Sequence, residues 1–238
     1  MKIEHLLSFE NQDVSITKII KITLITINIH SPNHDFIMKK LLSLFITLSM
    51  LTAMAFTSGG PSGYVVGDTA QDFNLKNVDN KLVSLAGIPD AKGYIVVFTC
   101  NHCPYAMAYE DRVIALHKKY ASQGFPVIAI NSNDKTIAPA DSYVNMQKRV
   151  KEKSIPYAYL YDETQEIAKT YGATRTPHVF VLDENRVVRY IGAIDDNSEE
   201  PSEVKEKYVE NAVDALLAGK EVPVKQTKAI GCGIKWKA

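Results

Sequence analysis

The chain has few cysteines and no excess of charge of either sign. Three cysteines in 238 residues are too few for the disulfide framework that holds small secreted domains together. The 27 Lys and Arg residues are balanced by 27 Asp and Glu residues, so we expect no nucleic-acid partner. No internal repeat occurs at solenoid or propeller periods. No Pro/Gly/Ser-rich linker divides residues 64–222, and the 46% hydrophobic content allows a sizeable core, so we predict one domain there.

The N-terminal part of the chain has the features of a secretory signal over residues 38–55. Two lysines precede an apolar stretch, and Ala53-Met54-Ala55 fits the small-residue pattern of a cleavage site. The apolar run is shorter than the roughly 20 residues that a membrane-spanning helix needs. We therefore expect an exported, periplasmic protein with no stable membrane span, in a compartment where disulfides persist. Residues 1–37 are interpreted as a start codon assigned too early, with a genuine extension as the alternative.

Strand and helix patterns alternate beyond this signal. An N-terminal β-hairpin comes first, continuous apolar runs then alternate with amphipathic stretches, and a second hairpin precedes a last helix. Asp162 and Gln165 are predicted to cap one helix, and Ser202 the last one. This order predicts an α/β fold with a central mixed sheet and helices on both faces. A C-terminal strap follows over residues 223–238.

The chemistry is expected at Cys100-Asn101-His102-Cys103, where a buried apolar run ends and a helical pattern begins. Pro104 suits the first helical position, because its missing N–H costs nothing there. The Cys100 thiol is then expected to face the positive end of the helix dipole, with His102 as a second positive neighbour. Both effects should lower the pKa of the cysteine and raise its thiolate fraction. We predict a redox-active pair, Cys100 and Cys103, tuned by His102.

Other uses of two cysteines at this spacing stay open. One is an inert structural disulfide, and another is a zinc site, although its further ligands would come from Cys232, His117 or His178 at no recognisable spacing. A third is a copper-binding module, since copper(I) suits two thiolates and an imidazole. His178 is more simply explained as a strand residue. We predict no metal and no cofactor.

Two further segments are candidates for the site. Thr176-Pro177 precedes a predicted strand, where a proline often marks a tight, sometimes cis, turn. A cis bond would expose the Thr176 backbone to a partner, so both residues are predicted to bind substrate. Cys232 lies in a Gly-Cys-Gly segment and is interpreted as a third redox thiol or a resolving cysteine, or as a free or buried thiol of the strap.

Charged and aromatic residues follow the cysteine pair on the predicted helix. Glu110, Asp111 and Arg112 are interpreted as a solvated face, with a proton relay for Cys103 as the alternative. We expect the tyrosines to pack in the core; they are Tyr105, Tyr109 and Tyr120.

Together these segments resemble the thioredoxin superfamily, and more closely its redoxin branch, the alkyl hydroperoxide reductase/thiol-specific antioxidant family. Within that branch they resemble a group of peroxiredoxin-like thioredoxin-family proteins. The matching stretches are "CNHCPY", "AINSND", "YLYDETQEIAKTYGA", "TP" and "GCGIKWK". The resemblance implies a thioredoxin-like three-layer fold with redox-active thiols and a disulfide or dithiol protein, or a peroxide, as partner. It names no substrate, and the oligomeric state stays unknown.

The sequence departs from these families at several positions. Thr99 stands where thioredoxins carry tryptophan, and "GYIVVF" lacks the buried aspartate that would accept the proton of Cys103. No threonine stands three residues before either cysteine, which weakens direct peroxide reduction. Arg175 stands where the closer group would carry a cysteine. We therefore predict an exported thiol–disulfide oxidoreductase, with a thiol peroxidase and a copper-binding module as alternatives. Its potential should lie near roughly −200 mV, more oxidising than thioredoxin's roughly −270 mV.

Overall fold

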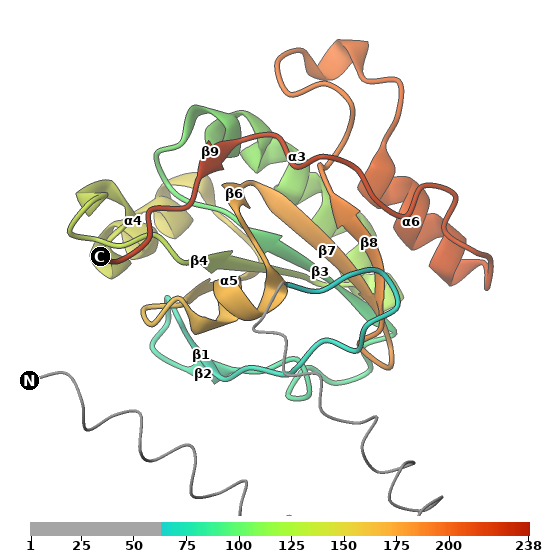
Figure 1. The fold of residues 1–238 in the computed structure, drawn as a ribbon, viewed down its shortest axis with the longest axis horizontal. Coiled ribbons are helices and arrows are strands. Elements are labelled where there is room, and N and C mark those ends of the chain that lie inside the picture. The colour runs from blue at the N-terminus through green and yellow to red at the C-terminus, as the bar shows by residue number, and fades with distance from the viewer. Residues whose placement is uncertain (1–62) are drawn as a thin grey trace, which may run out of the picture. The chain divides into compact units, whose positions relative to one another are not determined.

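The computed structural model describes residues 63–238 (Figure 1). The predicted early start over residues 1–37 and the predicted signal over residues 38–55 lie outside this part of the chain. Within the described part, no helix has the length and apolar character required to cross a bilayer.

Seven strands form the central sheet, in the order β2-β1-β5-β4-β3-β7-β8. They are β1 Leu75–Asn77, β2 Leu82–Val83, β3 Gly93–Phe98, β4 Val127–Asn131, β5 Ala158–Tyr161, β7 His178–Asp183 and β8 Val188–Gly192. Strands β3, β4 and β5 run parallel, whereas β1, β2, β7 and β8 pair antiparallel with their neighbours. The predicted mixed sheet and N-terminal hairpin are confirmed. A separate two-stranded sheet joins β6 (Arg175–Thr176) to β9 (Cys232–Gly233).

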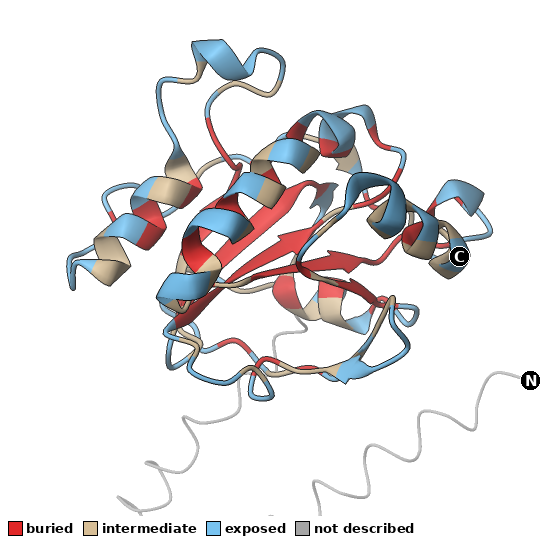
Figure 2. Ribbon diagram, turned by 180° about the vertical axis from the view of Figure 1, so that it is seen from behind, coloured by how far each residue is buried: buried red, intermediate tan, exposed pale blue. Residues whose placement is uncertain are grey.

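Helices cover both faces of the sheet. They are α3 Pro104–Tyr120, α4 Tyr143–Lys153, α5 Glu166–Tyr171 and α6 Tyr208–Leu217, with short 3₁₀ turns η2 Ala121–Gln123, η3 Pro139–Asp141 and η4 Pro201–Glu203. Apolar side chains of α3, α4 and α6 pack on one face of the sheet, while α5 and the segment before β3 pack on the other. Figure 2 shows buried residues along the sheet and on the inner sides of the helices. This is the predicted three-layer α/β arrangement.

The central strand β3 shows why the sheet needs both layers. Its six residues are all buried. Ile95 and Val97 belong to the core beneath α3, whereas Val96 and Phe98 belong to the core on the α5 side. Successive side chains of a strand point to opposite faces, so an unbroken apolar strand is stable only between two covering layers.

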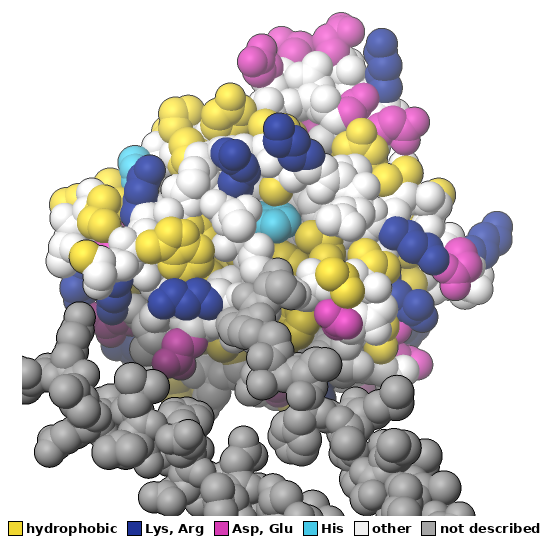
Figure 3. Space-filling view, in the orientation of Figure 1, with side chains coloured by type: hydrophobic (Ala, Val, Ile, Leu, Met, Phe, Trp, Pro, Cys, Tyr) yellow, Lys and Arg dark blue, Asp and Glu magenta, His cyan; other side chains and the backbone are white. Residues whose placement is uncertain are grey.

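The predicted cap at Ser202 is wrong, and the predicted capping box of Asp162 and Gln165 is confirmed only for Asp162. Ser202 lies in the turn η4, and α6 begins only at Tyr208, because Asp196 pairs through its backbone and side chain with Glu206 and Lys205. At α5, Asp162 accepts the backbone N–H of Ala168, but the Gln165 side chain donates instead to the strap. The loop that carries η4 projects from the body, and acidic side chains gather on it (Figure 3).

The C-terminal strap, residues 223–238, returns across the molecule to the cysteine motif (Figure 1). It first follows β8, where Ile191 exchanges backbone hydrogen bonds with Lys225 and Thr227. It then forms β9 against β6 and ends beside the start of α5, where Gln165 binds Lys235 and Lys237.

Candidate functional site

The two cysteines of the motif lie between β3 and α3. Cys100 follows the end of β3 by two residues, and Cys103 is the N-cap of α3, with Pro104 as the first helical residue. The predicted strand–motif–helix order is therefore observed. Both cysteines are buried, with 6% of Cys100 and 2% of Cys103 exposed.

Thr176 contacts both sulfurs. Its Oγ1 lies 3.2 Å from the Sγ of Cys100, and its carbonyl oxygen lies 3.4 Å from the Sγ of Cys103. The second contact is a hydrogen bond only when Cys103 is a thiol. The Thr176-Pro177 peptide bond is cis, so this local expectation from the sequence is confirmed. The structure thus brings Cys100, Cys103, Thr176 and Pro177 together.

The disulfide in this structure joins Cys103 to Cys232, not to Cys100. Cys100 is the free cysteine, and the three sulfur-bearing residues pack in one cluster with Ala106. Cys232 comes from β9 of the strap, opposite Thr176 of β6. The prediction considered Cys232 as a third thiol but did not pair it with Cys103. No local spacing links residues that lie 129 positions apart.

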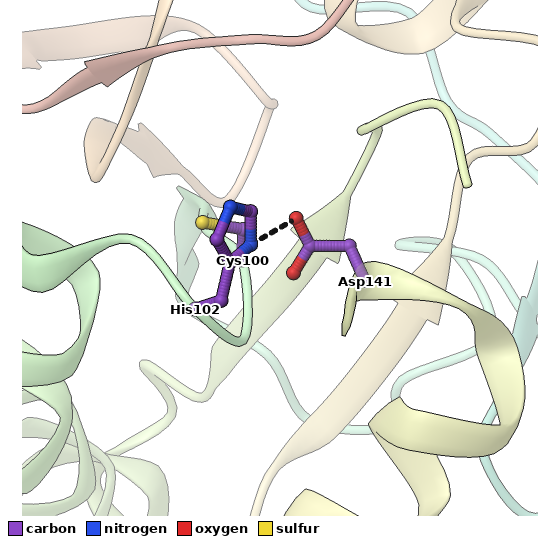
Figure 4. A group of neighbouring side chains, drawn as sticks. All are labelled: Cys100, His102 and Asp141. Atoms are coloured by element: carbon purple, nitrogen blue, oxygen red, sulfur yellow. Dashed lines mark ion pairs between the residues drawn. The ribbon is translucent and has the colours of Figure 1, made fainter. Parts of the chain in front are cut away.

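Asp141 is a site residue that the sequence did not identify. It ends η3, is 0% exposed, and accepts hydrogen bonds from the Asn101 backbone N–H (2.7 Å) and the Asn133 side-chain amide (2.7 Å). Its Oδ2 also lies 2.8 Å from Nδ1 of His102. Figure 4 shows this pair beside Cys100. A buried carboxylate therefore lies beside Cys100, although β3 itself carries none.

Burial raises the pKa of the Cys100 thiol, and the negative charge of Asp141 raises it further. Hydrogen bonds lower this pKa, but by less than burial and Asp141 raise it; the donors are the Thr176 hydroxyl and the backbone N–H groups of Cys103 and His102. The start of α3 does donate to the sulfur, as expected, yet the predicted lowering of this pKa is wrong. The helix-dipole reasoning omitted the desolvation of the sulfur and a nearby carboxylate.

One group of side chains could hold a metal ion. A ligand atom of each of Cys100, His102 and Asp141 lies within 4.8 Å of the other two. A thiolate, an imidazole and a carboxylate suit zinc, whereas copper(I) prefers a second soft ligand. His178 is not in this group; it lies in β7, and burial lowers its pKa to about 4. Its Nδ1 accepts the Thr174 backbone N–H, as a strand residue with a satisfied ring would.

The charged residues of α3 are less solvated than predicted. Glu110 accepts hydrogen bonds from Arg149, and Arg112 binds the buried Asp195. Only Asp111 of the three is exposed. Tyr109 and Tyr120 are buried as expected, but Tyr105 is exposed, since it lies in the first turn of α3 on the outer side.

A small cavity lies behind Cys100, on the inner side of α3. Its volume is about 20 Å³, and its walls include Cys100, Arg149, Tyr157 and Pro177. That volume holds one water molecule.

Comparisons with known proteins agree with this geometry. The Redoxin family matches residues 65–208. The Thiol-disulfide oxidoreductase ResA of Bacillus thuringiensis is 26% identical over 148 residues, which cover 60% of this chain and 76% of the relative. An uncharacterized conserved protein from Geobacillus kaustophilus has a TM-score of 0.69 and 39% identity, with 73% of this chain and 93% of that chain covered. A hypothetical protein from Sinorhizobium meliloti has a TM-score of 0.68 and 36% identity, with 74% and 97% covered.

The family match spans more than half of the chain, and the fold is the one predicted from the resemblance. The chain belongs to the Redoxin family, within the thioredoxin superfamily, and it is an oxidoreductase.

Proposed function

We propose that the protein is an exported thiol–disulfide oxidoreductase in which Cys100 attacks a disulfide of a partner protein. The attack forms a mixed disulfide through Cys100, and Cys103 then attacks Cys100 to release the reduced partner. The observation that carries this proposal is the convergence of both sulfurs on Thr176, beside the cis Pro177. The 26% identical relative named as a thiol–disulfide oxidoreductase supports the same chemistry.

The proton of Cys100 has an acceptor in this arrangement. His102 and Asp141 lie within 4.8 Å of the sulfur, and the imidazole binds the carboxylate at 2.8 Å. Transfer of the Cys100 proton to the His102–Asp141 pair generates the thiolate that attacks the partner protein. Asp141 acts through His102 and Asn101, so it is a positioning residue.

The direction of electron flow follows from the stability of the thiolate. A stable thiolate favours the reduced form of the pair and makes it oxidising. Burial and Asp141 destabilise the Cys100 thiolate. We therefore propose a reductase, with a potential nearer thioredoxin's roughly −270 mV than the roughly −200 mV expected from the sequence.

Export remains part of the proposal because residues 38–55 have the pattern of a cleavable signal. N-terminal sequencing of the protein recovered from the periplasm should find a start near Phe56. Recovery of the protein with residues 1–55 attached would contradict export through this signal.

A thiol peroxidase is the second candidate, favoured by one contact. The Thr176 hydroxyl lies 3.2 Å from the Cys100 sulfur. It could take the place of the threonine hydroxyl that is missing three residues before the cysteine. The size of the cavity behind Cys100 argues against a peroxidase. The cavity has room for one water molecule and is small for a peroxide, which has two oxygens.

The test is a trapping experiment. Replacing Cys103 and Cys232 together with serine removes both thiols that could release an adduct, so Cys100 should accumulate mixed disulfides with a model disulfide protein. The matched control carries serine at Cys100 and Cys232 and should trap little, because the remaining Cys103 is more deeply buried. Stronger trapping through Cys103 would reverse the two roles. A peroxide consumption rate far above that of a free thiol would favour the peroxidase instead.

A further inference from the structure

The strap places a cysteine directly at the proposed reaction site. Strands β9 and β6 pair antiparallel, with Cys232 opposite Thr176 and Gly233 opposite Arg175. Thr176 is the residue that both Cys100 and Cys103 contact through their sulfurs. Cys232 is partly buried, while Cys103, to which it is bonded, is almost fully buried.

The segment around Cys232 fits closely against the cis peptide. A Cβ atom added to Gly231 would collide with the carbonyl group of Thr176, so only glycine allows this approach. The Gly231 carbonyl oxygen accepts a hydrogen bond of 2.8 Å from Nη1 of Arg175. The neighbouring Gly233 has open space where its Cβ would lie. Of the two glycines that flank Cys232, Gly231 thus makes the close contact with Thr176-Pro177 and Gly233 does not.

The end of the strap is attached to the body by further hydrogen bonds. The Ile234 backbone N–H donates to Thr174, and that of Lys235 donates to the side chain of Asn133 (2.8 Å). Trp236, the single tryptophan of the chain, packs partly buried against the core on the α5 side. These contacts keep Cys232 near the other two thiols when it is not bonded.

We propose that Cys232 is a third working thiol, which exchanges one disulfide with Cys100 through Cys103; this inference rests on the proposed thiol–disulfide chemistry. The Cys100 thiolate attacks the Cys103 sulfur, the Cys100–Cys103 bond forms, and the Cys103–Cys232 bond breaks. Cys100 gives its proton to the His102–Asp141 pair, and the electron pair of the broken bond leaves with Cys232. The Cys232 thiolate then takes a proton from solvent. One disulfide is present before and after, so the step needs no oxidant or reductant.

The disulfide exchange gives the strap a role in the proposed thiol–disulfide reaction. With Cys103 bonded to Cys232, the resolving thiol is occupied and β9 covers the edge of β6. With Cys103 bonded to Cys100, the strap is held by hydrogen bonds and packing alone. Electrons that enter at Cys232 reach Cys100 through Cys103.

Disulfide mapping of the one-disulfide protein tests this without any substrate. Trypsin is expected to place Cys100 and Cys103 in one peptide, residues 93–112, and Cys232 in another, residues 229–235. After acid quenching and alkylation, a Cys103–Cys232 bond links the two peptides, whereas a Cys100–Cys103 bond leaves an alkylated Cys232 peptide and an internally bonded partner. The variants Cys100→Ser and Cys232→Ser mark the two species separately.

We expect both species in the wild-type protein, returning to the same ratio after either one is enriched. Finding only the Cys103–Cys232 bond until full reduction would overturn the proposal and make that bond structural. Finding Cys232 always free would overturn it too. The disulfide mapping uses no partner protein, so its result can be interpreted even if the trapping experiment fails.

A matched pair of strap variants gives a second readout. Gly231→Ala should shift the ratio toward the Cys100–Cys103 species by about tenfold, because its methyl group collides with Thr176. Gly233→Ala should leave the ratio unchanged, since its Cβ meets nothing within 4 Å. Trp236 lies four residues after Cys232, so its fluorescence should change with the ratio and report the loss of the strap's disulfide. Equal ratios in the two variants would contradict the close fit of Cys232 on which the exchange depends.

Discussion

Two buried aspartates lie near helix α3, and their partners differ in charge. Asp195 is 5% exposed and receives two hydrogen bonds from Nη1 of Arg112, at 2.7 and 2.9 Å, and one from the hydroxyl of Tyr109. Asp141 is fully buried, but its donors are the Asn101 backbone, the Asn133 amide and the His102 imidazole. No Lys or Arg among the described residues forms an ion pair with Asp141.

From this difference we infer a structural role for Asp195 and a functional role for Asp141. Arginine is always protonated, so Asp195 lies against a permanent positive charge. An imidazole, unlike a guanidinium, is not a permanent cation, and 43% of the His102 side chain is exposed. The charge of Asp141 is therefore free to act on the Cys100 thiol, whereas that of Asp195 is held by its partner.

The largest expected effect tests the structural half of this comparison. Arg112→Met should destabilise the protein by about 3–5 kcal/mol, because it leaves the buried Asp195 without its cation. Urea unfolding monitored by circular dichroism measures the loss. Lys119→Met is the control, because the exposed ion pair of Lys119 with Glu210 should be worth about 0–1 kcal/mol. A similar, small loss in both variants would show that Asp195 is not held as described.

A second change tests the functional half. Asp141→Asn removes the negative charge that raises the pKa of Cys100, so this pKa should fall. The rate of Cys100 alkylation should then begin to rise at a lower pH than in the wild type. In a background with serine at Cys103 and Cys232, exchange is removed and Cys100 is the one remaining cysteine, so the reaction reports on it alone. Asp195→Asn should leave the profile in place, and an equal shift in both variants would remove the distinction between the two carboxylates.

The smallest expected effect concerns His102. Its imidazole offsets part of the charge of Asp141, so His102→Ala should destabilise the Cys100 thiolate and lower the reduction potential of the Cys100–Cys103 pair. The half-exposed ring limits the change to about 30 mV, equivalent to tenfold in the equilibrium constant. Equilibration against a dithiol buffer, in a Cys232→Ser background that removes exchange, measures this shift. A rise in potential would mean that the imidazole does not act through the charge of Asp141.

Local sequence patterns predicted the parts of the fold that depend on neighbouring residues. The apolar run of β3, the helix opened by Pro104, and the cis bond before Pro177 are each determined within a few positions. The same reasoning failed at Ser202, because the pairing of Asp196 with Lys205 and Glu206 delays the helix start.

The site depends on contacts that no short pattern contains. Asp141 binds Asn101 from 40 positions away, and Asp195 binds Arg112 from 83 positions away. In the sequence, Asp141 stands just before a mostly polar helical stretch, where a buried acid and an exposed helix cap have the same local pattern. The pKa of Cys100 could not be predicted correctly without knowing that this carboxylate lies beside it.

The choice of cysteine partner also sets the size of the loop that the disulfide closes. The Cys103–Cys232 bond spans 129 residues, whereas a Cys100–Cys103 bond closes a loop of the motif alone. In the chain-entropy description, the long loop restricts the unfolded chain by about 5 kcal/mol and the short loop by about 2 kcal/mol. Two forms with the same number of electrons would then differ by about 3 kcal/mol in resistance to unfolding. The melting temperature of the oxidised protein therefore reports which pair of cysteines is bonded.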